Sequence, residues 1–261
     1  MRSKPSRIAR PPNPPATPSL ERGPRGGFLG GALAGLLLLV AACTGASSPT
    51  ETIPPVGSIG PSAAPSESHP AEASYPPGCP TKQPAPLPAG EKRTVTLNTA
   101  KGAIVISVDG SLSPIAAGNF VALVACHFYD GVIFHRIVPG FIIQAGDGTY
   151  GREPDVNPDY VGFGELPYKI KDEPVTTTYV RGTVAMARTN KADSADSQFF
   201  IVLDDSAAAT LGGPKANTYQ IFGSVTSGMD VVDTIGAGAN SGTPNYLSTN
   251  PVAITTATVG N

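Results

Sequence analysis

The feature that most constrains the fold is a pair of β-rich runs separated by three residues near the middle of the chain. Residues 132–138 read VIFHRIV, residues 142–146 read IIQAG, and Pro139-Gly140-Phe141 lies between them. Apolar and β-branched runs on either side of a short turn that contains Gly are typical of an antiparallel hairpin. The sequence therefore predicts a hairpin at the centre of a β-rich domain.

The length of the turn decides which side chains meet across this hairpin. A two-residue turn would place Arg136 opposite Ile143. A three-residue loop would place Arg136 opposite Gln144, and Val138 opposite Ile142 on the same face. We expect the three-residue loop, which brings a guanidinium and an amide together on a mostly apolar strand face. An edge salt bridge or a solvated arginine is the alternative explanation of this pair.

Composition and charge separate a basic beginning from an acidic remainder. The 261 residues include 28 Pro, 30 Gly and no Trp, and much of the proline lies before residue 90. Up to Cys43 there are 6 Lys and Arg against 1 Asp or Glu, so the remainder carries 18 − 6 = 12 against 20 − 1 = 19, a net charge of −7. Because phosphate binding requires clustered positive charge, we expect no nucleic-acid partner.

Residues 1–43 have the order of an export signal, with an Arg-rich lead and then an apolar run over residues 26–42. The end of this run, LVAAC at residues 39–43, resembles a bacterial lipobox, in which the cysteine (here Cys43) is lipidated. An uncleaved membrane helix is the alternative, although the 17 residues (42 − 26 + 1) are at the lower limit of the span of about 17 to 25 that a bilayer requires. Both interpretations anchor the rest of the chain to the membrane, outside the cytoplasm.

Residues 44–90 are rich in Pro, Ser, Ala and Thr and have few large apolar side chains. Such a segment cannot bury enough surface to offset the entropy of ordering, so we expect a disordered tether that acts as a semi-rigid spacer. The folded domain is expected to cover residues 91–261.

This domain is expected to be mainly β. Its strands are predicted at residues 93–97, 102–108, 132–138, 142–146, 182–187, 198–203, 221–225 and 254–259. One helix is expected to start at Ser113-Pro114 with Ser113 as its N-cap, and a second covers residues 229–235. Short strands with two helices suit a closed eight-stranded antiparallel barrel whose two open ends the helices cap.

Four motifs follow one another through this domain: FHRIVPGFIIQAGD at 134–147, GTVAMART at 182–189, SQFFIVL at 197–203 and YQIFGSV at 219–225. Their wording, order and spacing closely resemble the cyclophilin-type peptidyl-prolyl isomerases, over about residues 92 to 259. The resemblance implies a barrel that accelerates cis-trans exchange of X-Pro peptide bonds, with no metal and no cofactor.

The resemblance also implies roles for individual residues. Arg136 would donate a hydrogen bond to the proline nitrogen of the twisted amide, and Gln144 would orient Arg136 or the substrate carbonyl. Ala187 and Arg188 would present backbone groups to an extended peptide. The full set of expected substrate-binding residues is Phe141, Ile142, Ala187, Arg188, Gln198, Phe200, Leu211 and Tyr219.

Some of these positions have another explanation or depart from the family pattern. On hydrophobicity alone, Phe141, Phe200 and Leu211 would be ordinary core residues. Arg188 stands where relatives commonly have Asn, and only its backbone is implicated in binding. We interpret His135 as a structural histidine with satisfied hydrogen bonds on the strand face away from Arg136.

Export would place Cys79 and Cys126 in an oxidising compartment, where two thiols tend to form a disulfide. We expect this bond; a buried free Cys126 and an exposed free Cys79 are the alternative. A disulfide would fix the end of the tether to the domain, so that the ordered unit begins near Cys79.

The function that we expect is isomerisation of X-Pro bonds in exported proteins by a membrane-anchored monomer. The alternative is a catalytically idle module at the cell surface that binds proline-containing peptides in the same groove. Both functions need the same pocket, so the sequence leaves the choice to an activity measurement.

Overall fold

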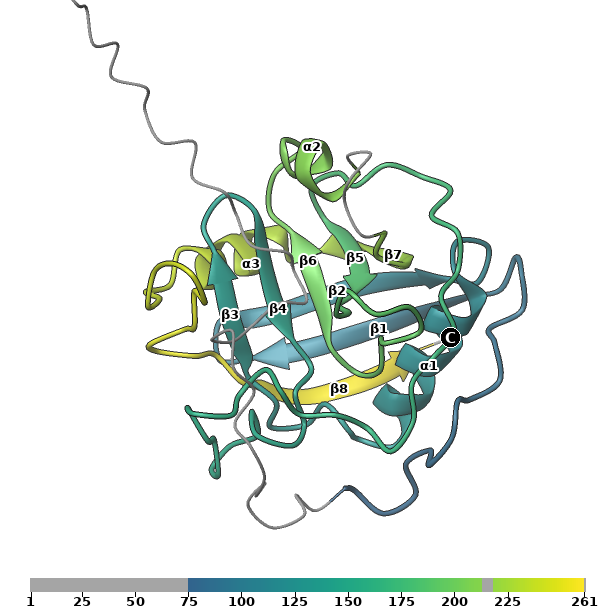
Figure 1. Cartoon of the computed structure of the whole chain (residues 1–261), viewed down its shortest axis with the longest axis horizontal. Coiled ribbons are helices and arrows are strands. Elements are labelled where there is room, and N and C mark those ends of the chain that lie inside the picture. The colour runs from purple at the N-terminus through teal and green to yellow at the C-terminus, as the bar shows by residue number, and fades with distance from the viewer. Residues whose placement is uncertain (1–74, 213–217, 261) are drawn as a thin grey trace, which may run out of the picture. The chain divides into compact units, whose positions relative to one another are not determined.

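The structure is a computed structural model that describes residues 75–212 and 218–260 (Figure 1). The expected export signal with Cys43, and residues 44–74 of the expected tether, lie outside the described residues. Within the described ranges no helix has the length and apolar character needed to cross a membrane. The elements in chain order are β1 (Lys92–Thr99), β2 (Gly102–Asp109), α1 (Pro114–Ala125), β3 (Phe134–Val138), β4 (Ile142–Ala145), β5 (Thr183–Met186), β6 (Phe199–Val202), α2 (Ala207–Leu211), β7 (Ile221–Ser227), α3 (Met229–Gly236) and β8 (Ile254–Gly260).

The eight strands form one antiparallel sheet in the order β3-β4-β6-β5-β7-β2-β1-β8, and the sheet curls so that its two halves cross (Figure 1). A continuously closed barrel, which we expected, is not formed, because within the described residues no ladder joins β3 to β8. The segment before β8 meets the β3 edge only at isolated points, such as the bridge between Ile133 and Ala253. Pro251 in this segment has no N–H to donate to a ladder.

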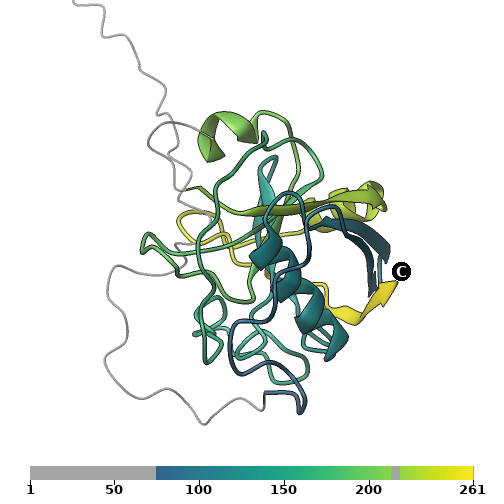
Figure 2. The same ribbon diagram turned by 90° about the vertical axis from the view of Figure 1, so that its right-hand side faces the viewer.

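Two helices cover the ends of the space that the curled sheet encloses. Alternate residues of β1 and β2 are buried, so each strand turns one face inward. Phe120 and Leu123 of α1 join the same core cluster as Val232 and Ile235 of α3. Figure 1 shows α1 and α3 at opposite ends of the sheet, and Figure 2 looks onto α1. The expected capping helices are therefore present, together with the unexpected short helix α2.

The N-terminus of α1 is capped by a different side chain from the one we expected. Ser113 is the N-cap residue, but its hydroxyl makes no capping bond and has no partner among the described residues. Instead, the carboxylate of Glu173 accepts hydrogen bonds from the backbone N–H groups of Ile115 at 2.8 Å and Ala116 at 3.0 Å. A carboxylate is favoured here because it satisfies free N–H groups at the positive end of the helix dipole.

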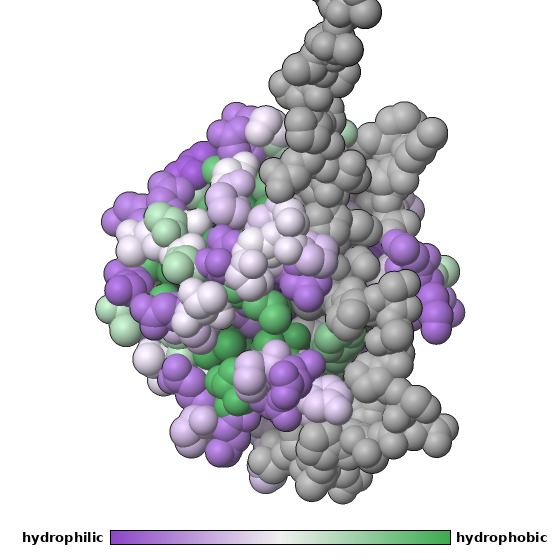
Figure 3. Space-filling view, turned by 60° about the vertical axis from the view of Figure 1, so that its left-hand side comes forward, coloured by the Kyte–Doolittle hydropathy of each residue, from purple (hydrophilic) through white to green (hydrophobic). Residues whose placement is uncertain are grey.

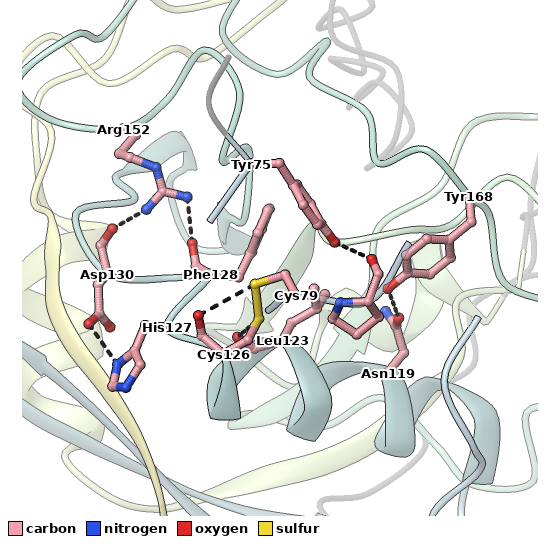
Figure 4. The surroundings of a disulfide bond; sticks show 11 residues. Tyr75, Cys79, Asn119, Leu123, Cys126, His127, Phe128, Asp130, Arg152 and Tyr168 are labelled. Atoms are coloured by element: carbon pink, nitrogen blue, oxygen red, sulfur yellow. Dashed lines mark hydrogen bonds and ion pairs between the residues drawn. A yellow bond between two sulfur atoms is a disulfide. The ribbon is translucent and has the colours of Figure 1, made fainter. Parts of the chain in front are cut away.

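Residues 75–90, which we assigned to the disordered tether, are packed against α1. A disulfide joins Cys79 to Cys126 at the C-terminal end of α1 (Figure 4), so the expected bond is confirmed. Leu87 is buried in the main core, and its N–H donates to the carbonyl of Pro114 at 2.9 Å. A Cβ at Gly118 would collide with the carbonyl oxygen of Ala85, so the close approach requires glycine there. We call residues 75–90 the strap.

The strap is also fixed by aromatic contacts near the disulfide (Figure 4). The ring of Tyr75 lies 5.8 Å from that of Phe128, and its hydroxyl donates to the carbonyl of Pro80 at 2.6 Å. The guanidinium of Arg152 packs on the same Phe128 ring, with its central carbon 5.6 Å from the ring centre. Among the described residues the folded unit therefore includes the strap, as the expected disulfide implied, and is not limited to residues 91–261.

A hollow of about 370 Å³ lies away from the strap, where α3 meets the segment before β8. Ile137, Ile235 and Val252 contribute apolar side chains to its lining. Seen from the side of β3 and α3, the surface shows apolar residues in a depression bordered by polar ones (Figure 3).

Candidate functional site

The hairpin formed by β3 and β4 has the register that we expected. Arg136 pairs with Gln144, and Val138 pairs with Ile142. A bulge between Phe134 and Arg136 shifts the pairing, so Phe134 is opposite Ala145. The three-residue loop therefore places the guanidinium and the amide side by side.

Arg136 makes two long hydrogen bonds, and one of its nitrogens has no partner among the described residues. Its side chain is buried. Nε donates to the carbonyl of Asn245 at 3.3 Å, and Nη1 donates to Oε1 of Gln144 at 3.5 Å. Nη2 is buried and has no hydrogen-bond partner among the described residues. Burial lowers the pKa of Arg136 to about 10, so the group is still a cation at neutral pH.

Gln144 and Gln198 form a chain of amides that continues from Arg136 into the long loop 148–179. Nε2 of Gln144 donates to Oε1 of Gln198 at 3.0 Å. Nε2 of Gln198 in turn donates to the carbonyl of Gly162 at 3.0 Å. Because each amide accepts at one end and donates at the other, the orientation of Gln144 toward Arg136 is fixed.

The expected proline-pocket residues come together in one apolar cluster beside Arg136. Phe200 and Tyr219 contact each other edge to face, with ring centres 5.4 Å apart. Tyr219 is positioned by Tyr179, whose hydroxyl accepts from the Tyr219 N–H and donates to the Tyr219 carbonyl, both at 2.8 Å. Burial raises the pKa of Tyr179 to about 12, so it stays protonated and able to donate. The cluster contains Phe141, Ile142, Ala187, Phe200, Leu211 and Tyr219.

A small cavity of about 40 Å³ lies next to this cluster. Its lining includes the remaining expected binding residues, Arg188 and Gln198, together with Gln144 and Ala187. The structure thus brings all of the expected site residues into one region, while their individual roles stay predictions.

The long loop that borders the site is held by one buried carboxylate. Oδ1 of Asp147, just after β4, accepts from the N–H groups of Thr149 at 2.9 Å and Tyr150 at 2.8 Å. Oδ2 accepts from the N–H groups of Gly162 at 2.6 Å and Gly164 at 3.0 Å. These bonds fix the carbonyl of Gly162, which is the acceptor that orients Gln198.

His135 is buried, and the hydrogen bonds that we expected for its ring are not formed among the described residues. Neither ring nitrogen has a hydrogen-bond partner within the described residues. Burial lowers the pKa of His135 to about 4, and the positive charge of Arg136 acts in the same direction while Asp147 opposes it. His135 lies at the bulge of β3, between the paired residues Phe134 and Arg136, and sequence spacing alone does not reveal a bulge.

Asn245 and Tyr246 belong to the site but were not among the expected residues. The carbonyl of Asn245 holds Arg136, and Tyr246 is buried in the apolar cluster. Both lie more than a hundred residues after Arg136, in a turn-rich stretch without periodicity, so no pattern in the sequence points to them. The backbone bond from the Ile137 N–H to the Tyr246 carbonyl, at 2.9 Å, fastens this stretch to β3.

Comparison with known proteins gives the same assignment over most of the domain. The family model "Cyclophilin type peptidyl-prolyl cis-trans isomerase/CLD" matches residues 94–259. A probable peptidyl-prolyl cis-trans isomerase of Brucella abortus is 37% identical over 178 residues, which is 66% of this chain and 84% of the relative. Peptidyl-prolyl cis-trans isomerase B of Escherichia coli is 36% identical over 149 residues, which is 54% of this chain and 82% of the relative.

Solved structures agree with the sequence comparison. A cyclophilin type peptidyl-prolyl cis-trans isomerase of Cryptosporidium parvum aligns with a TM-score of 0.53 at 25% identity, covering 66% of this chain and 99% of that one. The same protein, solved in the presence of the dipeptide Ala-Pro, aligns with a TM-score of 0.52 at 26% identity, covering 64% and 99%. The chain therefore belongs to the family of cyclophilin-type peptidyl-prolyl cis-trans isomerases.

Proposed function

We propose that this chain is an active peptidyl-prolyl cis-trans isomerase that acts on proline-containing segments of exported proteins. Family membership and the assembled site support the activity. The apolar cluster suits a proline ring, and Arg136 with the two glutamines borders it. The export-signal pattern of residues 1–43 supports the choice of exported clients. A monomeric state stays a prediction from the sequence.

The reaction needs no bond to be broken. Rotation about a peptide bond has a barrier of about 18 to 20 kcal/mol, because resonance gives the C–N bond partial double character. When the amide is twisted, resonance is lost and the proline nitrogen regains a lone pair that can accept a hydrogen bond. A catalyst therefore has to bind the twisted amide more strongly than either planar form.

The single observation that carries the proposal is the free Nη2 of Arg136. It is a buried, charged donor without a partner among the described residues, next to the apolar cluster. A fixed donor in a poorly hydrated site stabilises charge that develops only in the transition state. A hydrogen bond from a charged group is worth about 1.5 to 3 kcal/mol, which corresponds to about one or two factors of ten in rate. The remaining acceleration would come from holding the proline ring and the substrate carbonyl.

The test is the Arg136→Ala variant in an assay of cis-trans exchange on a short X-Pro peptide. Turnover should fall at least about tenfold while the chain still folds, because the transition-state donor is lost together with the bonds of Arg136 to Asn245 and Gln144. Arg136→Lys should recover little, since a point charge lacks the planar fork. Arg93 on β1, a half-buried arginine that pairs with Glu91, is the control, and Arg93→Ala should keep full turnover. Activity of Arg136→Ala within twofold of the parent would reject this mechanism, and a parent that binds the peptide without turnover would be the idle binding module.

We further propose that the domain is attached to the membrane through lipidated Cys43. The LVAAC sequence supports this over an uncleaved helix. Cys43→Ala in the full-length chain should abolish palmitate labelling and shift the processed size, measured by gel and mass spectrometry after labelling in a bacterial host. Labelling that persists in Cys43→Ala would contradict the lipid attachment.

A further inference from the structure

The side chain of Arg188 bends back across the rim of the site and contacts three acceptors. It is 8% exposed. Nη1 donates to the carbonyl of Thr218 at 3.2 Å. Nη2 donates to the carbonyl of Lys191 at 2.8 Å and pairs with Oδ2 of Asp172 at 3.2 Å. Nη1 and Nη2 are therefore occupied by this chain and are not directed at a substrate, whereas Nε is buried and has no hydrogen-bond partner among the described residues.

The three acceptors belong to three separate segments around the expected groove. Lys191 lies in the loop that follows β5, Asp172 lies in the long loop after β4, and Thr218 directly precedes Tyr219 of the apolar cluster. One planar group can reach all three because a guanidinium has five N–H donors in a fixed geometry. The backbone of Arg188 follows directly after Ala187, a member of the apolar cluster.

The loop after β5 is fixed by a second set of bonds at the same place. The Asp172 N–H donates to Oδ1 of Asp193 at 2.8 Å, and the Asp193 N–H donates to Oδ2 of Asp172 at 3.0 Å. Lys171 pairs with Asp193 at 2.7 Å. Asp172 therefore bonds both Asp193 and Arg188. Loss of either bond would weaken the attachment of the loop after β5 to the long loop.

The backbone of Arg188 is free while its side chain is fixed. Among the described residues, no backbone hydrogen bond uses the N–H or the carbonyl of Arg188. Ala187, just before it, is already paired, since its N–H donates to the carbonyl of Gln198 at 2.8 Å. A free donor and acceptor beside a paired strand end can bind an extended peptide as an added strand.

We infer that the Arg188 side chain is a positioning residue for substrate binding: it holds the Arg188 backbone and the Tyr219 wall in the geometry that accepts a proline-containing peptide. The inference rests on the proposed function, because it concerns the same groove. It assigns to the guanidinium a task that an asparagine at this position could not perform, since an amide is too short and has too few donors to reach three segments. The effect falls on affinity, because Arg136 and Gln144 are not touched.

The test compares Arg188→Gln and Arg188→Lys with the parent, using the dissociation constant of a short X-Pro peptide by NMR titration, together with KM and kcat for the same peptide. In Arg188→Gln the dissociation constant and KM should rise about threefold to tenfold while kcat stays within twofold, because a loop that is competent only part of the time binds more weakly by that fraction. Arg188→Lys keeps the charge beside Asp172 but should restore less than half of the lost affinity.

Arg181 gives a matched control at the other end of β5. Its guanidinium likewise bonds a carbonyl, that of Leu203 at 2.6 Å, and a carboxylate, that of Asp233 at 2.7 Å. Arg181→Gln therefore removes the same types of bond away from the groove, and should lower stability without changing the dissociation constant.

An unchanged dissociation constant in Arg188→Gln, or an equal rise in Arg181→Gln, overturns the inference, as does a fall in kcat with KM unchanged. Because binding is measured directly, an inactive parent would reject the proposed isomerase activity and leave the test of Arg188 intact.

Discussion

Arg136 and His135 are neighbours on β3, and both side chains are buried. At neutral pH one of them is charged and the other is neutral. Burial lowers the pKa of Arg136 to about 10 and that of His135 to about 4. Arg136 therefore remains charged, as a donor to a developing lone pair must, while His135 is neutral. A neutral imidazole beside the guanidinium avoids a second positive charge in the same buried region.

His135 should make the fold sensitive to acid. Its folded pKa of about 4 lies below the usual 6.5, so the unfolded chain binds the extra proton first as the pH falls. The contribution of neutral His135 to stability is complete above about pH 6.5 and is lost as the pH falls toward 4. Between pH 7 and pH 4.5 the parent should lose about 2 to 3 kcal/mol that His135→Gln does not lose.

The measurement is urea unfolding of parent and His135→Gln at both pH values, and the difference between the two proteins isolates this group from Asp147 and the other carboxylates. Parallel pH profiles for the two proteins would show that His135 is not buried in its neutral form.

At the scale of single elements, the cap of α1 should be worth more than a surface contact. Glu173 comes from the long loop and satisfies two N–H groups of the first turn, and Nε2 of Gln220 donates to the same carboxylate at 3.2 Å. Glu173→Ala should lower the free energy of unfolding by about 1 to 2 kcal/mol, the range found for lost N-caps. Glu165 is a suitable control, since its pairing with Lys169 is solvent-exposed, and Glu165→Ala should change stability by less than about 0.5 kcal/mol. Chemical unfolding at neutral pH checks both values, and equal losses would contradict the capping role.

The elements were predictable where a local pattern decides them. Alternation by two residues gave β1 and β2, and the three-residue loop gave the register of Arg136 with Gln144. The cap of α1 was not predictable in this way. Ser113 has the right residue type at the right place, but a carboxylate nearly sixty residues away in sequence reaches the same N–H groups, and only the folded chain brings it there.

The site shows the same division between local and long-range information. Motif wording identified part of the apolar cluster and the two glutamines, but not the bond between them, whereas Asn245 and Tyr246 are brought to β3 by the path of the chain before β8. Composition placed the strap in the disordered tether, and only the expected disulfide indicated that its end is ordered. Its composition is that of a disordered tether, and a covalent bond together with a few contacts such as Leu87 orders it on the domain.

At the scale of the whole molecule, the disulfide makes the strap part of the folding unit. Cys79 and Cys126 are separated by 47 positions, so the bond closes a loop of 47 + 1 = 48 residues. On the chain-entropy model such a loop stabilises the fold by about 4 kcal/mol, because the crosslinked unfolded chain has fewer conformations to lose. Cys79→Ser with Cys126→Ser should therefore lower the free energy of unfolding by about this amount, measured by urea unfolding of the full chain. The parent measured with reductant should show the same loss.

Turnover separates this covalent effect from damage to the site. The bond joins the strap to the end of α1 (Figure 4), and neither cysteine contributes to the cluster that contains Phe200 and Leu211. The double variant should therefore keep the kcat of the parent below its own melting temperature, while it unfolds at a lower urea concentration. Alkylation of the exported protein under denaturing conditions gives the chemical check: neither Cys79 nor Cys126 should react with iodoacetamide before reduction, and both should react afterwards. Modification of both without reductant would mean that the strap is held by its packing on α1 alone, and the double variant should then be as stable as the parent.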